Sequence, residues 1–327
     1  MFMKRALLSP ILALCAACGV SFVTAGPSAA ETYPTRPIHF IVPFPGGPSD
    51  ILTRLYAQKL SEHWKQPAVV EDRAGATGTI GTEAVVRAAP DGYTLLFTVE
   101  LPITMAPSLL KLHYDPQRDL APIAAVAETE NVLVASPAAG IRSMADLVAA
   151  AKAKPGKLTF ASAGYGSPAH LCGEMIKQQA GIDMVHVPYN AAAQAMNAIL
   201  AGDVTVFCGP IAQALPFIKS AKAYALGATG PKRSALLPDV DALSASYPGL
   251  VISNWFGLLV PIRTPAAVRE ALQDEFKAIA ADAELQNKLF SIGLEPTWIS
   301  GADLAKRIAS DTAKWHAFMA AANIHVD

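Results

Sequence analysis

The chain of 327 residues has the length of two domains of ordinary size. Apolar residues make up 52% of it and charged residues 16%, which excludes the disordered class and allows large buried cores. Its 26 basic residues nearly balance its 27 acidic ones and form no basic run, so the sequence lacks the charge pattern of a nucleic-acid-binding protein.

The chain begins with the features of a cleaved signal peptide. A short basic region (Lys4, Arg5) precedes an apolar stretch (7–23), and the Ser-Ala-Ala of residues 28–30 predicts cleavage before Glu31. Proline and glycine interrupt the apolar stretch and small residues follow it, so we do not expect a membrane anchor. In a Gram-negative source, export of such a chain predicts a periplasmic protein.

The four cysteines fall into two pairs. Cys15 and Cys18 lie in the predicted leader, where lipidation is the less favoured alternative because the residue three before Cys18 is Cys15 instead of leucine. Cys172 and Cys208 remain after cleavage. In an oxidising compartment they can form one disulfide or stay as two buried thiols, and the sequence leaves both states open.

After cleavage the chain alternates strands and helices, which predicts a parallel sheet with crossover helices. The predicted strands are 38–44, 68–73 and 94–99, and the predicted helices run from Ser49 to Trp64 and from the second glycine turn to Pro90. Residues 101–121 are rich in proline and are expected to be irregular.

A second α/β unit follows. Its predicted strands are 131–136, 158–162, 184–189, 204–208 and 224–229, and its helices are 143–154, 168–180 and a short one that stops at Gly202. A last strand at 255–261 precedes helices at about 265–280, 283–291 and 301–323. These helices have no predicted strand partners, so we expect them to pack on the first unit.

This arrangement predicts three parts: a signal peptide (1–30), a first lobe (31–130 plus 255–327) and a second lobe (131–254). The chain would cross between the lobes near Glu130 and near Asn254. Two such crossovers form a hinge that allows the lobes to open and close.

Three glycine turns follow predicted strands and lead into helices: 45–48, 74–79 and 163–168. Glycine leaves the N–H groups of a helix N-terminus free for an anion, and open α/β sheets bind ligands at the carboxyl ends of their strands. One such turn alone is equally an ordinary tight connection. The recurrence predicts a ligand cleft between the lobes.

Enzyme motifs fail on inspection. Residues 75–81 lack the Lys-Ser/Thr of a phosphate-binding loop, Gly164-x-Gly166 lacks the third glycine of a dinucleotide fingerprint, and no nucleophile elbow surrounds Ser162 or Ser167. His170 and Cys172 stand two apart on a helix and therefore point in different directions, so we expect no metal site and no cofactor. A serine hydrolase that uses Ser162 or Ser167 with His170 remains the weakest alternative.

The chain resembles the Bug-type (TctC-like) substrate-binding receptors of tripartite tricarboxylate transporters. The resemblance covers essentially the whole mature chain, and its motifs in order are Tyr33-Pro34-x-x-Pro37-Ile38, Ile41-Val42-Pro43-Phe44 with Gly46-Gly47-Pro48-Ser49-Asp50, Glu71-x-Arg73-x-Gly75-Ala76-x-Gly78-x-Ile80-Gly81, Ala89-Pro90-Asp91-Gly92-Tyr93-Thr94-Leu95-Leu96, Pro155-Gly156-Lys157-Leu158, Ala161-Ser162-Ala163-Gly164-x-Gly166-Ser167, His186-Val187-Pro188-Tyr189 and Trp255-Phe256-Gly257-Leu258-Leu259-Val260-Pro261.

The resemblance implies a two-lobe periplasmic binding protein of the Venus-flytrap type II class, each lobe a mainly parallel sheet flanked by helices. It also implies that the first two glycine loops hold one carboxylate of a small organic ligand, partly through waters, and that the third loop and the segment after Tyr189 meet its far end. The expected binding residues are Phe44, Pro45, Gly46, Ser49, Asp50, Ala76, Thr77, Gly78, Glu100, Ala163, Gly164, Tyr165, Gly166, Ser167, His170, Tyr189, Asn190 and Cys208. On this basis a Gly78→Val side chain would occupy the anion site.

We expect a monomer that delivers its ligand to membrane permease subunits. A sensor that hands its closed form to a signalling protein is the alternative.

Two departures from the family pattern bear on the ligand. The chain has one residue fewer than usual between Phe44 and the Gly46-Gly47 pair, which affects the water-bridged geometry. Cys208 stands where many members carry an aspartate that can pair with a ligand ammonium. We therefore expect a di- or tricarboxylate or an aromatic carboxylate without an amino group. Tyr165, Tyr189 and Phe44 would offer flat surfaces to an aromatic ring. Glu100 leaves open an amino-acid ligand, unless it is a solvated hinge residue.

Overall fold

The computed structural model of the protein describes residues 33–321. The predictions of a signal peptide, of cleavage before Glu31 and of a lipidation alternative fall outside the described residues. Among the described helices none combines the length and the apolar character needed to cross a membrane.

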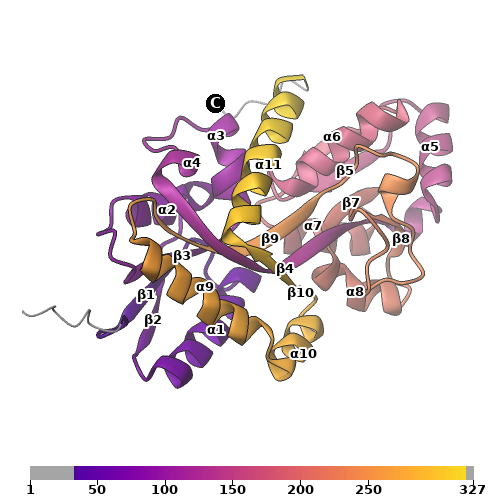
Figure 1. The fold of residues 1–327 in the computed structure, drawn as a ribbon. Coiled ribbons are helices and arrows are strands. Elements are labelled where there is room, and N and C mark those ends of the chain that lie inside the picture. The colour runs from indigo at the N-terminus through magenta and orange to yellow at the C-terminus, as the bar shows by residue number, and fades with distance from the viewer. Residues whose placement is uncertain (1–32, 322–327) are drawn as a thin grey trace, which may run out of the picture. The chain divides into compact units, whose positions relative to one another are not determined.

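Ten strands form one connected sheet (Figure 1). They are β1 (Ile38–Val42), β2 (Ala68–Asp72), β3 (Thr94–Val99), β4 (Leu120–Ala135), β5 (Thr159–Ser162), β6 (Val185–Pro188), β7 (Val206–Pro210), β8 (Tyr224–Ala228), β9 (Ser253–Pro261) and β10 (Glu295–Ser300). Their order is β2-β1-β3-β9-β4-β7-β5-β6, and β8 and β10 also pair with β4.

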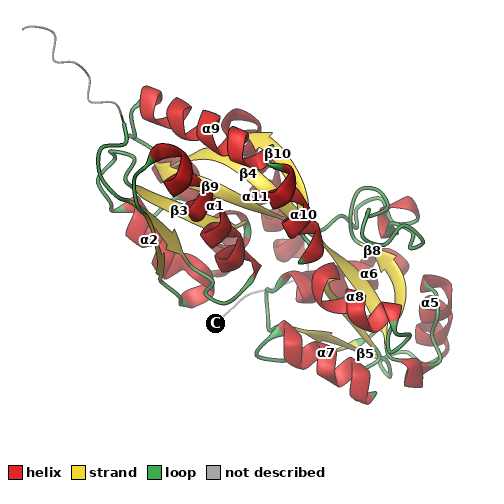
Figure 2. Ribbon diagram, turned by 90° about the horizontal axis from the view of Figure 1, so that it is seen from below, coloured by secondary structure: helices red, strands yellow, loops and turns green. Residues whose placement is uncertain are grey.

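Helices lie on both sides of the strands, as Figure 2 shows. They are α1 (Pro48–Trp64), α2 (Thr79–Val86), α3 (Ala106–Leu109), α4 (Pro116–Asp119), α5 (Met144–Ala153), α6 (Pro168–Ala180), α7 (Ala192–Ala201), α8 (Ile211–Lys219), α9 (Ala266–Ala280), α10 (Ala283–Ser291) and α11 (Gly301–Ala321). Single turns form η1 (Ala76–Gly78), η3 (Pro137–Ala139) and η4 (Leu243–Ala245), and η2 (Leu101–Met105) is a π-helix.

The long strand β4 divides the sheet into two groups of strands. Its first part, Leu120–Glu130, pairs antiparallel with β9, and its last part, Asn131–Ala135, pairs antiparallel with β7. In the first group β1, β2 and β3 are parallel, and in the second β5 is parallel to β6 and β7. The predicted α/β architecture with strands in two groups is therefore present. The residue bounds of the two lobes stay a prediction.

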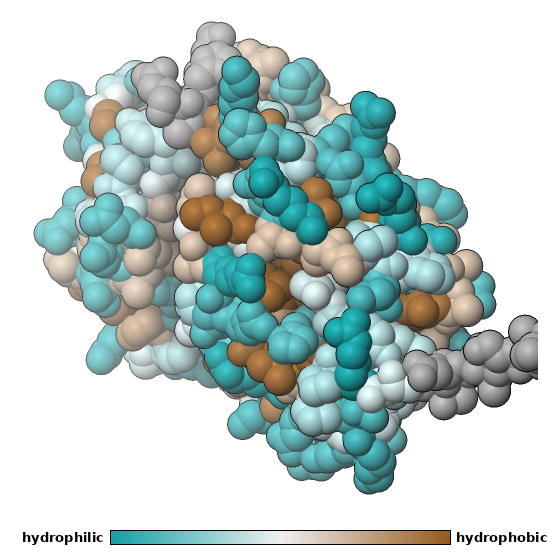
Figure 3. Space-filling view, turned by 90° about the vertical axis from the view of Figure 1, so that its left-hand side faces the viewer, coloured by the Kyte–Doolittle hydropathy of each residue, from teal (hydrophilic) through white to brown (hydrophobic). Residues whose placement is uncertain are grey.

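Each group has its own hydrophobic core. In the first, α1 and α9 pack on the sheet, and the rings of Tyr56 and Phe276 stack at 5.3 Å. In the second, α6 packs on β5 through Leu171 and Phe160. On the face that carries β1, β2 and α2, hydrophobic residues lie in separate patches among hydrophilic ones (Figure 3), which is ordinary for a protein surface.

The C-terminal region differs from the prediction. The helices were expected to lack strand partners, but β10 pairs antiparallel with β4. It escaped the sequence pattern because it is short, half buried throughout and interrupted by Pro296. Helix α11 also does not pack on the first group alone. Leu304 and Ile308 join a core cluster with Leu96, whereas Trp315 and other residues near its end join the core of the second group.

Two further elements differ from their predicted extent. Strand β4 begins at Leu120, far before the expected 131, because its first part is alanine-rich and lacks the β-branched pattern of a strand. Helix α8 was not predicted, since Pro216 inside it and the Gly209-Pro210 pair before it are helix-breaking signals.

Candidate functional site

The first glycine loop (residues 43–47) connects β1 to α1. The N-cap of α1 is Gly47 and the first helical residue is Pro48, one residue before the predicted start at Ser49. Proline is favoured at this position because its missing N–H is not needed there. Ser49 therefore lies in the first turn, where it is buried and its hydroxyl has no hydrogen-bond partner among residues 33–321. Such a free donor at a helix N-terminus suits an anion.

Asp50 holds this loop in place. Its Oδ2 accepts a hydrogen bond from the N–H of Gly46 at 2.9 Å, and its Oδ1 lies 2.7 Å from Nε of Arg54. The carboxylate is nearly buried and already engaged. Its negative charge would also repel the carboxylate of a ligand. Asp50 is therefore better described as a positioning residue than as a ligand contact.

The second glycine loop contains η1 and carries backbone strain. Ala76, Thr77 and Gly78 have φ angles of 45°, 54° and 88°, a left-handed region that costs roughly 1–2 kcal/mol for a residue with a Cβ. Ala76 and Thr77 are exposed. Strain of this kind persists where the surrounding structure enforces it, which happens most often at binding sites.

The first two loops touch each other through Gly78. A Cβ on Gly78 would lie 2.7 Å from Cζ of Phe44. A side chain at Gly78 would therefore collide with the phenyl ring. The expectation that it would occupy the anion site stays a prediction. The Phe44 ring lies between the two loops, so it is not free to offer a flat surface to a ligand ring.

The third glycine loop (residues 163–167) connects β5 to α6. Ser167 is the N-cap of α6, which begins at the predicted residue 168: its Oγ accepts the N–H of His170 at 3.3 Å and donates to the carbonyl of Gly164 at 2.7 Å. A Cβ on Gly166 would lie 2.8 Å from Cδ1 of Leu109, so this loop packs against α3.

The segment after β6 lies beside the third loop. The N–H of Tyr189 donates to the carbonyl of Ser162 at 3.0 Å, and the Tyr189 ring packs on the core around α7. Asn190 is exposed, and its N–H donates to Oε1 of Gln194 at 3.2 Å. The structure thus brings together Gly164 and Tyr189, as expected.

His170 is a neutral part of this loop. Its Nδ1 accepts the N–H of Gly166 at 3.1 Å, which places the ring proton on Nε2. Burial lowers the pKa of His170 to about 4, so the ring carries no positive charge for an anion at neutral pH. Its ring stacks on His186 at 4.2 Å and meets the edge of Tyr165 at 5.3 Å. Tyr165 is 63% exposed and offers an aromatic surface at the tip of the loop.

Ser162 pairs with a histidine that sequence reasoning missed. Its hydroxyl lies 2.6 Å from Nε2 of His186, not next to His170. Ser162 is fully buried, and Nδ1 of His186 has no partner within the described chain, so no third group orients the imidazole. The pair is structural. Only the parallel register of β5 and β6, which sets His186 beside Phe160, could have indicated it.

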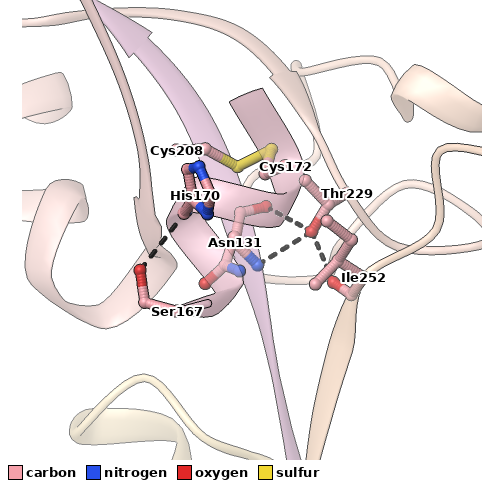
Figure 4. Close-up of a disulfide and its surroundings, with 7 residues drawn as sticks. All are labelled: Asn131, Ser167, His170, Cys172, Cys208, Thr229 and Ile252. Atoms are coloured by element: carbon pink, nitrogen blue, oxygen red, sulfur yellow. Dashed lines mark hydrogen bonds between the residues drawn. A yellow bond between two sulfur atoms is a disulfide. The ribbon is translucent and has the colours of Figure 1, made fainter. Parts of the chain in front are cut away.

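Cys208 is not available to a ligand. It forms a disulfide with Cys172, with the sulfur atoms 2.09 Å apart, which is one of the two states that the sequence left open (Figure 4). The bond joins β7 to α6, the helix that begins with Ser167 and His170. Because the disulfide anchors α6 to β7, Cys208 helps to fix the position of the third loop.

Glu100 precedes η2, an element that contacts η1 of the second loop. It follows β3 and is 1% exposed, so the interpretation as a solvated hinge residue is wrong. Burial, followed by the neighbouring charge of Asp311, raises the pKa of Glu100 to about 8. Glu100 lines a cavity of about 460 Å³ with residues of β4, β10 and α11, and the lining contains no residue of the glycine loops.

Comparison with known proteins places this chain in a family. The model of the tripartite tricarboxylate transporter family receptor (TctC) matches residues 52–324. Protein BugT of Bordetella pertussis is 33% identical over 309 residues, which cover 92% of this chain and 95% of that protein.

Two solved structures from Rhodopseudomonas palustris resemble the fold along almost its whole length. Rpa4515 with adipate has a TM-score of 0.78 and 29% identity, and covers 89% of this chain and 99% of its own. MatC with bound malate has a TM-score of 0.74 and 26% identity, and covers 88% and 99%.

These proteins share the two-lobe α/β fold predicted here and are solute-binding receptors instead of enzymes. Membership of this group of periplasmic binding proteins implies a periplasmic location. The chain belongs to the tripartite tricarboxylate transporter receptor family.

Proposed function

We propose that the protein captures a small organic carboxylate outside the cytoplasm and delivers it to the membrane permease subunits of a tripartite transporter. One observation carries the proposal: the free hydroxyl of Ser49 and the strained turn Ala76–Gly78 stand on two loops that touch through Phe44. The relatives that hold adipate and malate, both dicarboxylates, support this ligand class.

The first carboxylate group of the ligand would sit at the N-terminus of α1. No lysine or arginine stands within the loop 43–47 or the turn Ala76–Gly78, so helix N–H groups, backbone amides and the Ser49 hydroxyl would supply the hydrogen bonds. The far end would meet the third loop, where the N-terminus of α6 suits a second carboxylate and Tyr165 suits an aromatic ring.

The ligand would lack an amino group. Cys208 is held in its disulfide, and Glu100 lines a different cavity. Asp50 is engaged by Gly46 and Arg54. An ammonium buried among the loops would therefore have no free carboxylate, which is costly.

Ligand capture would use a hinge between residues 31–130 plus 255–327 and residues 131–254. Support comes from the antiparallel crossing of β4 and β9, where Glu130 pairs with Ser253. Beside it, the Thr229 hydroxyl accepts the N–H of Asn131 and also bonds the carbonyl of Ile252 (Figure 4). These bonds fix the crossing segments to each other, and the two groups of strands would rotate about them.

Calorimetric titration of the mature chain with succinate, adipate, malate, benzoate and terephthalate tests the proposal, with aspartate and phenylalanine as amino-bearing controls. We expect at least one amine-free carboxylate to bind more tightly than its amino analogue. Tighter binding of the amino acids would contradict the ligand class, and a folded protein that binds none would contradict the function. Ligand uptake by vesicles that hold the permease separates delivery from a sensor role.

A further inference from the structure

A charged cavity of about 460 Å³ lies where α11 crosses β4, β9 and β10. Its walls carry five acidic and three basic side chains, a formal excess of two negative charges: Glu100, Glu128, Glu130, Glu295 and Asp311 against Lys232, Arg307 and Lys314. The N-terminal end of β10 and the loop after β8 bring elements of both strand groups to this cavity.

Arg307 forms ion pairs with two of the acidic groups. Its guanidinium donates to Oε1 of Glu128, lies 3.3 Å from Oδ2 of Asp311 and donates to Oγ of Ser253 at 3.0 Å. These contacts use three of the five N–H groups of the guanidinium. Arg307 makes no hydrogen bond to Glu100 or Glu130 in the described part of the chain, although its positive charge also acts on Glu100.

The remaining wall groups are also engaged or exposed. Glu295 accepts the hydroxyl hydrogen of Ser234 at 2.7 Å, and the ammonium of Lys314 donates to the carbonyl of Val251. Lys232 is exposed to solvent. Neither lysine forms an ion pair or a hydrogen bond with Glu100 or Glu130 in the described chain, although the charge of Lys314 acts on Glu100 and that of Lys232 on Glu130.

Glu100 and Glu130 make no ion pair with a basic side chain among residues 33–321, although the charges of nearby basic groups act on both carboxyls. They are 1% and 9% exposed, and neither Oε1 of Glu100 nor Oε2 of Glu130 has a hydrogen-bond partner in the described part of the chain. Both side chains line the cavity. An unpartnered buried carboxylate is costly and is normally paired with a cation or protonated.

We propose that this cavity binds a small organic cation through a primary ammonium group, which Glu100 and Glu130 hold. A divalent metal needs several converging ligands, and residues 33–321 contain no group of three His, Cys, Asp or Glu side chains placed to hold one. An ammonium instead offers three separate N–H donors to acceptors on different walls. The volume fits a small molecule. The site is distinct from the glycine loops, so the inference goes beyond the proposed carboxylate receptor.

Proton linkage follows from the same geometry. Burial raises the pKa of Glu100 to about 8 and that of Glu130 to about 7. Without a cation Glu100 is mostly protonated near neutral pH and Glu130 is about half protonated. An ammonium must displace these protons, so its binding releases protons and strengthens as pH rises toward about 8.

Calorimetry of the mature chain with 1,4-diaminobutane tests the site at pH 6 and pH 8.5. We expect binding to be about tenfold or more tighter at pH 8.5, with a heat that depends on the buffer because protons are released. Glu100→Gln and Glu130→Gln keep the side-chain shape and should each weaken binding about tenfold or more. Glu284→Gln removes an exposed carboxylate elsewhere and should change nothing.

Several outcomes would overturn the inference. One is that the diamine does not bind the folded protein at either pH. The others are that it binds equally well to both glutamine variants, or that Mg²⁺ or K⁺ at equal concentration outcompetes it. Succinate and adipate titrations of the same samples report on the glycine loops alone. Loss of carboxylate binding with retained diamine binding would contradict only the proposed function, and the reverse only this inference.

Discussion

The ring of Phe44 lies directly over Gly78, where a Cβ would come within 2.7 Å of Cζ and 3.2 Å of Cβ of Pro43. This contact joins the loop after β1 to the loop after β2. It fixes the position of the strained turn Ala76–Gly78 relative to the N-terminus of α1. The two candidate carboxylate-binding segments therefore form one unit, whose geometry depends on the absence of a side chain at Gly78.

Gly78→Ala should destabilise the protein for two reasons, the collision with Phe44 and the left-handed φ of +88°. Gly46→Ala is the matched control, because Gly46 has a φ of +71° but no atom within 4 Å of the place where a methyl group would lie. From urea unfolding we expect a loss of about 1 kcal/mol for Gly46→Ala and about 2–4 kcal/mol for Gly78→Ala. Adding Phe44→Leu to Gly78→Ala should recover part of the difference. Equal losses for both alanine variants would show that Phe44 exerts no steric control.

Ser49→Ala should weaken carboxylate binding about tenfold without lowering stability, because the hydroxyl makes no hydrogen bond in the described chain. Ser61→Ala in the same helix is the control. Its hydroxyl donates to the carbonyl of Ala57 and accepts the N–H of Ala68, each at 2.9 Å, so its loss should cost about 1 kcal/mol of stability and no affinity. Calorimetry with the best carboxylate and urea unfolding check both variants. Unchanged affinity in Ser49→Ala would remove Ser49 from the site.

Much of the fold could be predicted because its signals are local. The strand ending at Val42 is a β-branched run followed by proline and glycine, and α6 begins with a serine cap, a proline at its first position and a glycine after its end. Such signals depend on a few neighbouring residues. They placed the three glycine loops at strand ends.

The missed features depend on contacts between distant segments. Strand β10 is defined by its pairing with β4, and His186 is defined by its hydrogen bond to Ser162. The charged cavity joins residues of β3, β4, β10 and α11, so Glu100 alone could not reveal its neighbours. The direction of Gly78 toward Phe44 is likewise a property of two loops together.

The mature protein should contain no free thiol, because Cys172 and Cys208 form a disulfide. The bond closes a sequence separation of 36 residues, so its removal should lower the free energy of unfolding by about 3–4 kcal/mol if the bond acts by restricting the entropy of the unfolded chain. The double variant Cys172→Ala, Cys208→Ala and reduction of the unaltered protein should agree within error. A thiol assay in denaturant that finds two thiols before reduction would contradict the bond.

Glu100→Gln should make stability less dependent on pH. The pKa of Glu100 is raised from 4.5 to about 8, mainly by burial, so the folded protein holds this proton where the unfolded chain has released it. The stabilisation is complete below pH 4.5 and is lost as pH rises through 8. Burial lowers the pKa of His170 and His186 to about 4, which acts in the opposite direction but only below pH 6.5.

Between pH 6.5 and 8.5 the change in stability with pH therefore reports on the buried carboxyl groups. In amine-free buffer, the free energy of unfolding of the unaltered protein should fall by about 2 kcal/mol between these two pH values through Glu100 alone. The reason is that each pH unit below the folded pKa is worth about 1.4 kcal/mol. Glu100→Gln should remove that part of the slope and be the more stable protein at pH 8.5. Glu284→Gln, an exposed carboxylate, should keep the full slope. If Glu100→Gln and Glu284→Gln give the same slope, Glu100 is ionised in the folded protein throughout, and a cation already neutralises it.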